Sequence, residues 1–429
     1  MDKNYTKHHL LDFINPKMHI ENDVNPLRCL SLSDKDVSKM GGFDEVVYIM
    51  NRNLRVEDNF ALNFALLNAE KYNSLFKILV FLDKTTGFTA QKYAFLQKNL
   101  NVLFKNLESN KTDFEYVFDD RKNLIKRLPK KKNVLIVSDF NPLFHSDLDK
   151  DDRVVFVDAF NIVPAFYADD SLAYNAASLR RKIYKKIYDF LTEFPKKSFE
   201  KNNGYELLDD FLKTKLSDYA LHKNNPVLDV VSRLSPYLNN GFLSSQRVAL
   251  EVLKSDNSRE NKEAFLEELV VRKELSDNFC FYNKNFKSFE GLPAWAKFSL
   301  NQHKNDLRNF LYSTEELENA KTADLLWNAS QNQLKQEGRI HGYMRMYWSK
   351  QIANWSVSPQ EAIDKAIYLN DKYGFDAPSC NGYVGILWSI GGLHDRPFQD
   401  RLVSGKIRSM TYNGAKSKFN VQEYIKRYG

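Results

Sequence analysis

Tryptophan is the residue type whose placement in this sequence most suggests chemistry. Only five occur among 429 residues, and Trp348 and Trp355 stand seven positions apart. In a helix that spacing is two turns, so both side chains fall on one face with roughly 10.5 Å of axial rise between them. Such a pair is often core packing. Because indole is also among the most readily oxidised side chains, a row of indoles could carry electrons from the surface to a buried redox group.

A second candidate feature is the turn SRLSPYL at residues 232–238, in which serines and a proline lead into a helical segment. Hydroxyl groups and free backbone N–H groups at the start of a helix can hold a pyrophosphate. The same S-x-x-S arrangement is far more often a simple helix cap. The residues alone leave both interpretations open.

Basic residues gather at the end of the chain. The whole chain carries a formal charge of +7, and residues 396–429 hold eight basic and two acidic residues, a net charge of +6. A solvated, lysine-rich tail is one interpretation. Apolar side chains are interleaved, however, at Ile407, Met410, Tyr412 and Phe419. We therefore expect a folded segment whose charges can meet phosphate groups.

The elements that must position these residues fall into two classes. β-rich runs at 46–50, 77–82, 133–140 and 153–160 alternate with helical patterns at 60–72 and 93–107. This alternation predicts an α/β domain with a parallel, doubly wound sheet. Its ligand pocket should lie beyond the carboxyl ends of the strands, at Asn51, Asp83, Asp139 and Asp158. No glycine-rich dinucleotide or P-loop motif is present.

After Pro164 the pattern becomes helical, with amphipathic stretches at 179–191, 204–220, 244–254 and 262–275. The predicted organisation is an N-terminal arm at 1–43, an α/β domain at 44–165, a linker at 166–200 and an all-α domain at 201–429. The linker would contain the charged SLRRKIYKK stretch and Pro195. The arm is expected to be flexible or to hold short helices.

Composition excludes several classes of protein. Hydrophobic residues make up 43% and aromatics 14%, which favours packed cores over disorder. The three cysteines, Cys29, Cys280 and Cys380, form no C-x-x-C pair, so neither a disulfide framework nor a metal site is expected. The sequence shows no signal peptide and no apolar stretch of membrane-spanning length. We expect an intracellular protein, cytoplasmic or nuclear, that acts as a monomer and does not bind membranes.

Several separated strings resemble one family, the class II cyclobutane pyrimidine dimer photolyases of the photolyase and cryptochrome superfamily. They run in family order from about residue 45 to 420: NRNLRVEDNFAL (51–62), VDAFNIVPAF (157–166), SRLSPYLNNGFLSSQ (232–246), FLEELVVRKELSDNFCFYN (265–283), HGYMRMYWSKQIANW (341–355), YLNDKYGFD (368–376), NGYVGILWSIGGLHDR (381–396) and GKIRSMTYNGAKSKF (405–419). The resemblance implies light-driven repair of pyrimidine dimers in ultraviolet-damaged double-stranded DNA. Its architecture would be an α/β antenna-type domain followed by an all-α flavin-binding domain.

The resemblance also implies a set of FAD contacts. Ser232, Leu234 and Ser235 would meet the flavin phosphates, with Tyr219 and Asn278 nearby. Three further residues would surround the ring system and the adenosine half: Arg345, Asn370 and Asp376. An antenna chromophore of deazaflavin or folate type is a further expectation, although Phe160 and Phe166 stand where class II sequences usually carry histidine and tryptophan.

Roles in electron transfer and lesion binding follow from the same resemblance. Trp348, Trp327 and Trp355 would be the proximal, middle and distal members of a chain that reduces the flavin. Three residues would meet the lesion or its flanking phosphates in addition to Glu268 and Met346. Trp388 would stack on the flipped dimer, and Arg396 and Arg408 would bind phosphate. Three glycines would allow close approach of the backbone to DNA: Gly391, Gly392 and Gly405. Trp295 receives no role.

Two other functions are compatible with the same fold. A cryptochrome-like flavin photoreceptor would use the same cofactor and signal through a partner. An enzyme for the other major ultraviolet lesion would place histidines beside the dimer, and His341 and His394 are the candidates. Neither histidine lies in the sequence context of that activity.

Overall fold

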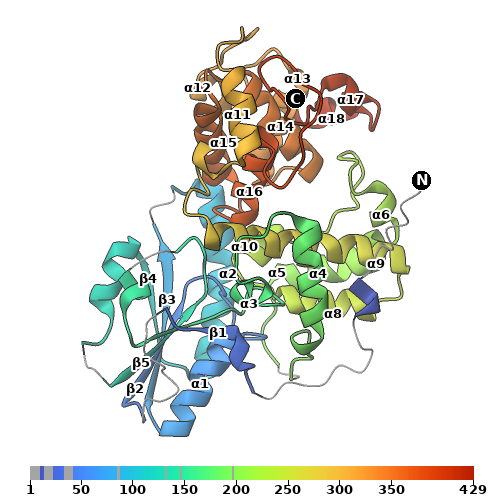
Figure 1. Ribbon diagram of the computed structural model, residues 1–429. Coiled ribbons are helices and arrows are strands. Elements are labelled where there is room, and N and C mark those ends of the chain that lie inside the picture. Colours follow the sequence, from blue (N-terminus) through green and yellow to red (C-terminus); the bar gives the residue numbers. More distant parts are fainter. Residues whose placement is uncertain are drawn as a thin grey trace. The chain divides into compact units, whose positions relative to one another are not determined.

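The computed structural model describes residues 10–13, 23–32, 42–84, 87–130, 133–144, 147–195 and 198–429 (Figure 1). The chain divides into two compact units. Unit 1 comprises Met1–Thr85, Asn99–Ala220 and Ser232–Asn278, and unit 2 comprises Thr86–Lys98, Leu221–Val231 and Phe279–Gly429. These units group residues by contact, and the domain boundaries predicted from the sequence remain predictions.

Unit 1 contains a sheet that has six strands within the described residues, in the order β1-β6-β5-β2-β3-β4. β2 to β6 run parallel to one another, as predicted. Their bounds are β2 (Glu45–Met50), β3 (Leu75–Asp83), β4 (Phe114–Asp119), β5 (Val134–Asp139) and β6 (Val154–Val157). All side chains of β5 and β6 are buried, which explains why both read as continuous apolar runs. The α/β class with a doubly wound sheet is confirmed.

Two strands were not predicted. β4 carries exposed Tyr116 and Phe118 and lies at the edge of the sheet, so its sequence is not a continuous buried run. β1 (Cys29–Leu30) pairs antiparallel with β6. The expectation of a flexible or short-helical arm is therefore wrong at Cys29 and Leu30, because backbone pairing with β6 builds them into the sheet. The rest of the predicted arm lies partly outside the described residues.

The carboxyl ends of the strands are occupied by the chain's own loops. Asp139 Oδ2 accepts hydrogen bonds from the backbone N–H groups of Asn51, Arg52 and Asn53 at 2.8 to 2.9 Å. Asp158 likewise accepts bonds from the backbone N–H groups of residues 160, 161 and 165. These two carboxylates hold the loops after β2 and β6 in place, and the ligand pocket predicted beside them stays a prediction.

The helices of unit 1 follow the predicted pattern with two corrections. The predicted linker contains α3 (Ala165–Ala168) and α4 (Ala176–Lys186), so SLRRKIYKK is a helix with a capping box at Asn175. The stretches at 204–220 and 262–275 are not uniform α-helix. They contain π-helical segments at Phe211–Lys215 and Glu267–Arg272, flanked by α5 (Asn203–Asp210), α9 (Arg259–Leu266) and α10 (Lys273–Tyr282).

Unit 2 is helical, and its helices pack on one another in the orange and red part of Figure 1. The helices used below are α11 (Ala294–Gln302), α13 (Leu325–Glu337), α14 (Gly342–Asn354), α15 (Pro359–Tyr373), α16 (Cys380–Gly391), α17 (Tyr412–Lys416) and α18 (Val421–Tyr428). No helix in the described part of the chain has the length and apolar character needed to cross a bilayer.

Candidate functional site

Three tryptophans form a row in unit 2. The ring centroids of Trp348 and Trp327 are 6.2 Å apart and the rings are parallel within 3°, while Trp327 and Trp355 are 5.6 Å apart at 73°. All three side chains are buried. Trp355 in turn meets Tyr312 edge-on at 5.2 Å. Trp327 thus lies between the two residues that the seven-residue spacing singled out.

Two helices and their caps hold this row. Trp348 lies on α14, Trp355 caps the end of α14, and Trp327 lies in the first turn of α13, whose N-cap is Asp324. The indole N–H of Trp327 donates to the Trp348 carbonyl and that of Trp348 donates to Gln331, both at 2.9 Å. Each of these two buried indoles therefore has a hydrogen-bond acceptor, and its ring orientation is fixed.

A polar group lies on the same helix as Trp348, one turn earlier. Arg345 donates to both carboxylate oxygens of Asp376 at 3.1 and 3.2 Å, and Arg345 is half-buried whereas Asp376 is buried. Asn370, near the end of α15, is buried and its amide donates to Asp371 at 3.0 Å. Glycine at position 382 allows this packing, because a Cβ there would lie 3.0 Å from the Asn370 amide nitrogen.

Trp388 is half-buried and lies beside two cations. The Lys350 Nζ is 4.9 Å and the Arg408 guanidinium 5.9 Å from the centre of its ring. Arg408 makes two bonds to Asp395, at 2.8 and 3.1 Å. Burial lowers the pKa of Lys350 to about 7. The indole face therefore lies next to positive charge, which is favourable for an aromatic ring.

The residues near Trp388 show why this segment is rich in glycine. Gly392 has φ +62° and ends α16, and a Cβ there would approach Trp295 to 2.7 Å. Glycine at position 392 therefore allows close packing against Trp295, for which no role was predicted, and the predicted approach of this backbone to DNA stays a prediction. Arg396 is exposed and lies over the Phe398 ring. Met346 is half-buried on α14.

Unit 1 holds the other predicted site residues. Tyr219 packs edge-on against Phe211 and Phe265, and burial raises its pKa. Glu268 lies in the π-helical segment Glu267–Arg272. Such segments are frequent at functional sites, but the sequence pattern does not distinguish them from α-helix.

The predicted phosphate turn is also in unit 1. The Ser232 hydroxyl accepts a bond from Leu234 N–H at 3.4 Å, and Leu234 is fully buried as the N-cap of a short helix, Ser235–Asn239. Ser235 is exposed. The Asn278 side chain is engaged by the chain itself, since it accepts from Ala173 N–H and donates to the Ser171 carbonyl.

Phe160, which departs from the class II pattern, lies between two buried cations of unit 1. The Arg52 guanidinium is 3.4 Å and Lys273 Nζ 4.0 Å from the ring centre. Phe166, the other departure, packs edge-on against Phe140 at 5.1 Å. Both phenylalanines therefore serve as packing groups in this part of the chain.

The two histidines considered for another lesion chemistry have structural surroundings. His341 caps α14, with its Nδ1 accepting from Tyr343 N–H, and burial lowers its pKa to about 4. His394 has φ +61° and packs edge-on against Phe279. Within the described residues, no group of three or more histidine, cysteine, aspartate or glutamate side chains is placed to hold a metal ion.

Comparison with known proteins decides the family. The chain is 38% identical over 435 residues to the deoxyribodipyrimidine photo-lyase of Arabidopsis thaliana, which covers 89% of this chain and 88% of the relative. The chain belongs to the deoxyribodipyrimidine photo-lyase family. The photo-lyase of Potorous tridactylus is 37% identical, and the match covers 89% of this chain and 80% of the relative. The photo-lyase of Methanothermobacter thermautotrophicus is 30% identical, and the match covers 94% of this chain and 98% of the relative. No protein family model matches the chain.

Solved structures of a photolyase and of a cryptochrome show the same fold. A bacterial class III photolyase from Agrobacterium tumefaciens superposes with a TM-score of 0.66 at 15% identity, covering 92% of this chain and 88% of the other. A cryptochrome from Synechocystis superposes with a TM-score of 0.62 at 16% identity, covering 91% and 87%. The predicted photolyase/cryptochrome architecture and the photo-lyase enzyme class are confirmed.

Proposed function

We propose that the chain repairs cyclobutane pyrimidine dimers in ultraviolet-damaged double-stranded DNA in a light-driven reaction, as a photolyase of class II with noncovalently bound FAD. When bound, reduced FAD supplies, after absorbing blue or near-ultraviolet light, the electron that opens the cyclobutane ring and then takes that electron back. The reaction therefore involves no net oxidation or reduction. The chain's own residues hold the cofactor and the lesion and keep the cofactor reduced.

The residues of unit 2 fit an electron-accepting ring system. The Arg345 guanidinium is positively charged, partly exposed and held in place by its ion pair with Asp376. Asn370 offers a neutral amide that can hydrogen-bond a ring nitrogen. On unit 1, Ser232, Leu234 and Ser235 supply hydroxyl and backbone groups for phosphate, with Tyr219 and Asn278 as the remaining proposed contacts. The Asn278 side chain already bonds to Ala173 and Ser171. It would contact the flavin through the donor and acceptor positions that these two bonds do not use.

The tryptophan row is the observation that carries the proposal. Trp348, Trp327 and Trp355 are in ring contact in that order, within one unit, and two of the three indole N–H groups are satisfied inside the protein. Close contact between rings is what electron transfer along side chains requires. We assign Trp348 as the proximal, Trp327 as the middle and Trp355 as the distal member.

Lesion binding is assigned to a second set of residues. Trp388 offers a partly exposed indole face for a flipped base, and Met346 offers a soft apolar contact. Glu268 would bond the polar edge of the pyrimidine. Arg396 and Arg408 would contact phosphates on either side of the lesion.

The absorption spectrum and repair activity of the purified protein test this proposal. We expect a flavin band, and we expect blue light to restore pyrimidines in a dimer-containing oligonucleotide only when the flavin is reduced. A deazaflavin or folate antenna would add a second near-ultraviolet or blue band. Flavin that photoreduces normally in a protein without repair activity would contradict the proposal and favour a cryptochrome-like photoreceptor.

Substitution Trp388→Ala should weaken binding of dimer-containing DNA much more than binding of undamaged DNA. Stacking of a base on an aromatic ring contributes roughly 1–3 kcal/mol, and only the flipped lesion uses it. Binding titrations with both DNAs, with flavin content measured for each preparation, check this. Equal losses for the two DNAs would remove the stacking role from Trp388.

A further inference from the structure

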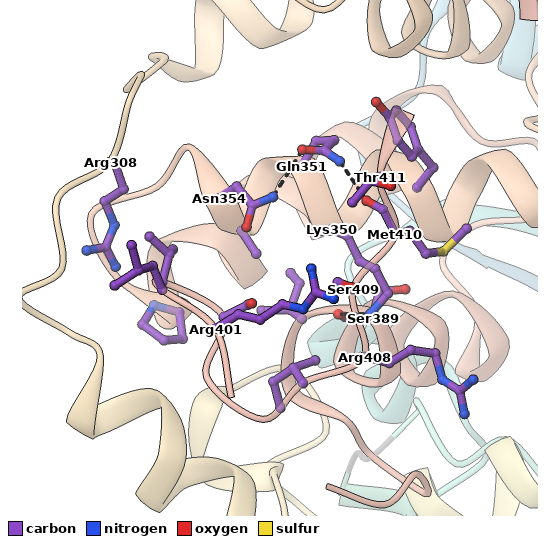
Figure 2. Close-up of a pocket in the computed structure, with 18 of the residues that line it drawn as sticks. Arg308, Lys350, Gln351, Asn354, Ser389, Arg401, Arg408, Ser409, Met410 and Thr411 are labelled. Atoms are coloured by element: carbon purple, nitrogen blue, oxygen red, sulfur yellow. Dashed lines mark hydrogen bonds between the residues drawn. The ribbon is translucent and has the colours of Figure 1, made fainter. Parts of the chain in front are cut away.

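A pocket of about 600 Å³ in unit 2 (Figure 2) is lined in part by Lys350 and Arg408, the two cations near the Trp388 ring. It is lined by the second half of α14, the end of α16 and the segment from residue 401 to 412. Its volume is within the range typical of small-molecule sites. Of the residues proposed above to contact FAD, the pyrimidine dimer or its flanking phosphates, Arg408 alone lines this pocket.

The floor of the pocket offers buried donors. Lys350 is 5% exposed, and among the described residues its Nζ has one hydrogen-bond acceptor, the Ser389 carbonyl at 2.8 Å. An ammonium group has three N–H donors, so donors remain unused. The Ser389 hydroxyl is also buried and has no partner in the described part of the chain. A buried donor without an acceptor is costly, and a bound acceptor would remove that cost.

The charges around the pocket have one predominant sign. Four basic residues line it, namely Arg308, Lys350, Arg401 and Arg408, and the one acidic lining residue is Asp324. The Asp324 carboxylate is already used, because it accepts bonds from Tyr347 and from two backbone N–H groups of α13. The pocket is therefore suited to an anion with several acceptor oxygens.

Arg401 is the cation best placed to complete the site. Figure 2 shows its guanidinium directed toward Lys350, Ser389 and Ser409, whereas that of Arg408 points away from them. Arg408 is already paired with Asp395, but among the described residues Arg401 has no ion pair. Its five N–H donors are available to a planar or tetrahedral oxyanion.

We infer that this pocket is a phosphate-binding subsite, in which Lys350, Ser389 and Arg401 hold one phosphodiester group of the DNA strand beside the lesion. The inference rests on the proposed function. A phosphate group carries the charge and the acceptor oxygens that these donors require. Since Lys350 also lies 4.9 Å from the Trp388 ring, the subsite would fix the DNA backbone next to the proposed stacking residue.

The test compares three variants of the flavin-loaded enzyme, Arg401→Ala, Lys350→Met and the control Lys98→Ala. Lys98 is an exposed residue of α2 (Ala90–Ser109), and its loss removes the same charge outside the pocket. We expect Arg401→Ala and Lys350→Met each to weaken binding of undamaged duplex DNA roughly tenfold at low salt. Each should also lower the salt slope by about one, while Lys98→Ala changes neither.

Inorganic phosphate distinguishes the two sources of the anion. In the unaltered enzyme it should compete with DNA more strongly than chloride at equal ionic strength, and Arg401→Ala should abolish this excess. Phosphate binding that the variants weaken while DNA affinity stays unchanged would overturn the inference in favour of a free-phosphate site. DNA binding by both pocket variants equal to that of Lys98→Ala, in enzyme that still repairs dimers, would overturn the subsite and leave the proposed function intact. Absence of repair by the unaltered enzyme would refute the proposed function itself.

Flavin content and circular dichroism show whether Lys350→Met is misfolded. If it is, the DNA affinity of Arg401→Ala decides whether the subsite exists, because Arg401 is exposed and its loss should not disturb the fold.

Discussion

Two buried clusters in this chain differ in the kind of side chain that forms them. In unit 2, Trp348, Trp327 and Trp355 are joined by ring contacts and few hydrogen bonds. In unit 1, Arg52 and Asp277 form a buried ion pair at 2.7 Å, next to buried Lys273 and Glu274. The first cluster is apolar and easily oxidised, whereas the second is charged and held by an ion pair and several hydrogen bonds.

This difference distinguishes the tryptophan row, which is proposed to transfer electrons, from the charged cluster, which stabilises the fold. The charged cluster fixes the loop after β6, because Lys273 donates to the Phe160 carbonyl and Glu274 accepts from Ile162 N–H at 2.7 Å. The indole hydrogen bonds of the tryptophan row go to Trp348 and Gln331, which lie within α14 and α13. Substitutions in the charged cluster should therefore reduce stability, and substitutions in the tryptophan row should reduce function.

The largest expected loss of stability comes from Arg52→Met. Asp277, whose side chain is 2% exposed, would lose its direct ion pair and keep its bond from Asn161 and the nearby charge of Lys273. Breaking such a pair costs about 3–5 kcal/mol of unfolding free energy. Denaturant unfolding measures it, with Lys213→Met as the control, because the Lys213–Asp209 pair is exposed and should contribute little. Equal stability of the two variants would contradict the structural role of the charged cluster.

A smaller effect on stability should depend on pH through Glu274. Burial raises the pKa of this carboxyl from 4.5 to about 8, despite the nearby Lys273. A group that binds its proton more tightly when folded contributes stability that is complete below about pH 4.5 and lost as the pH rises toward 8. Glu274→Gln removes this titration and keeps an oxygen acceptor for Ile162 N–H.

Unfolding free energies measured at several pH values between about 5 and 8 test this expectation. The unaltered protein should lose stability across the interval, and the decline should be shallower in Glu274→Gln. Parallel pH profiles for the two proteins would show that Glu274 does not titrate in this range.

Much of the fold was predictable because periodicity reports burial directly. The helix at 60–72 matches α1 (Phe60–Tyr72), and four apolar runs match β2, β3, β5 and β6. The edge strand β4 was not predicted because only one of its six side chains is fully buried, so it shows no continuous apolar run. The π-helical segments were not predicted from the sequence because one extra residue in a helical turn leaves the amphipathic pattern almost unchanged.

The candidate site was predictable only in part. Residue spacing placed Trp348 and Trp355 on one helix, but Trp327 lies 21 residues before Trp348, and no local pattern brings it between them. The pocket beyond Asp139 and Asp158 was expected from strand topology alone. Hydrogen bonds from the chain's own loops occupy both carboxylates, and these depend on tertiary packing that periodicity does not describe.

Trp348→Phe tests most directly the claim that the tryptophan row serves function and not stability. The change keeps an aromatic ring and removes the bond to Gln331, so the unfolding free energy should fall by only about 1–2 kcal/mol. Photoreduction of oxidised flavin should be lost, because phenylalanine is much harder to oxidise than tryptophan. Repair by chemically reduced enzyme should remain close to that of the unaltered protein. Photoreduction at an unchanged rate, or loss of repair by the chemically reduced variant, would contradict the assignment.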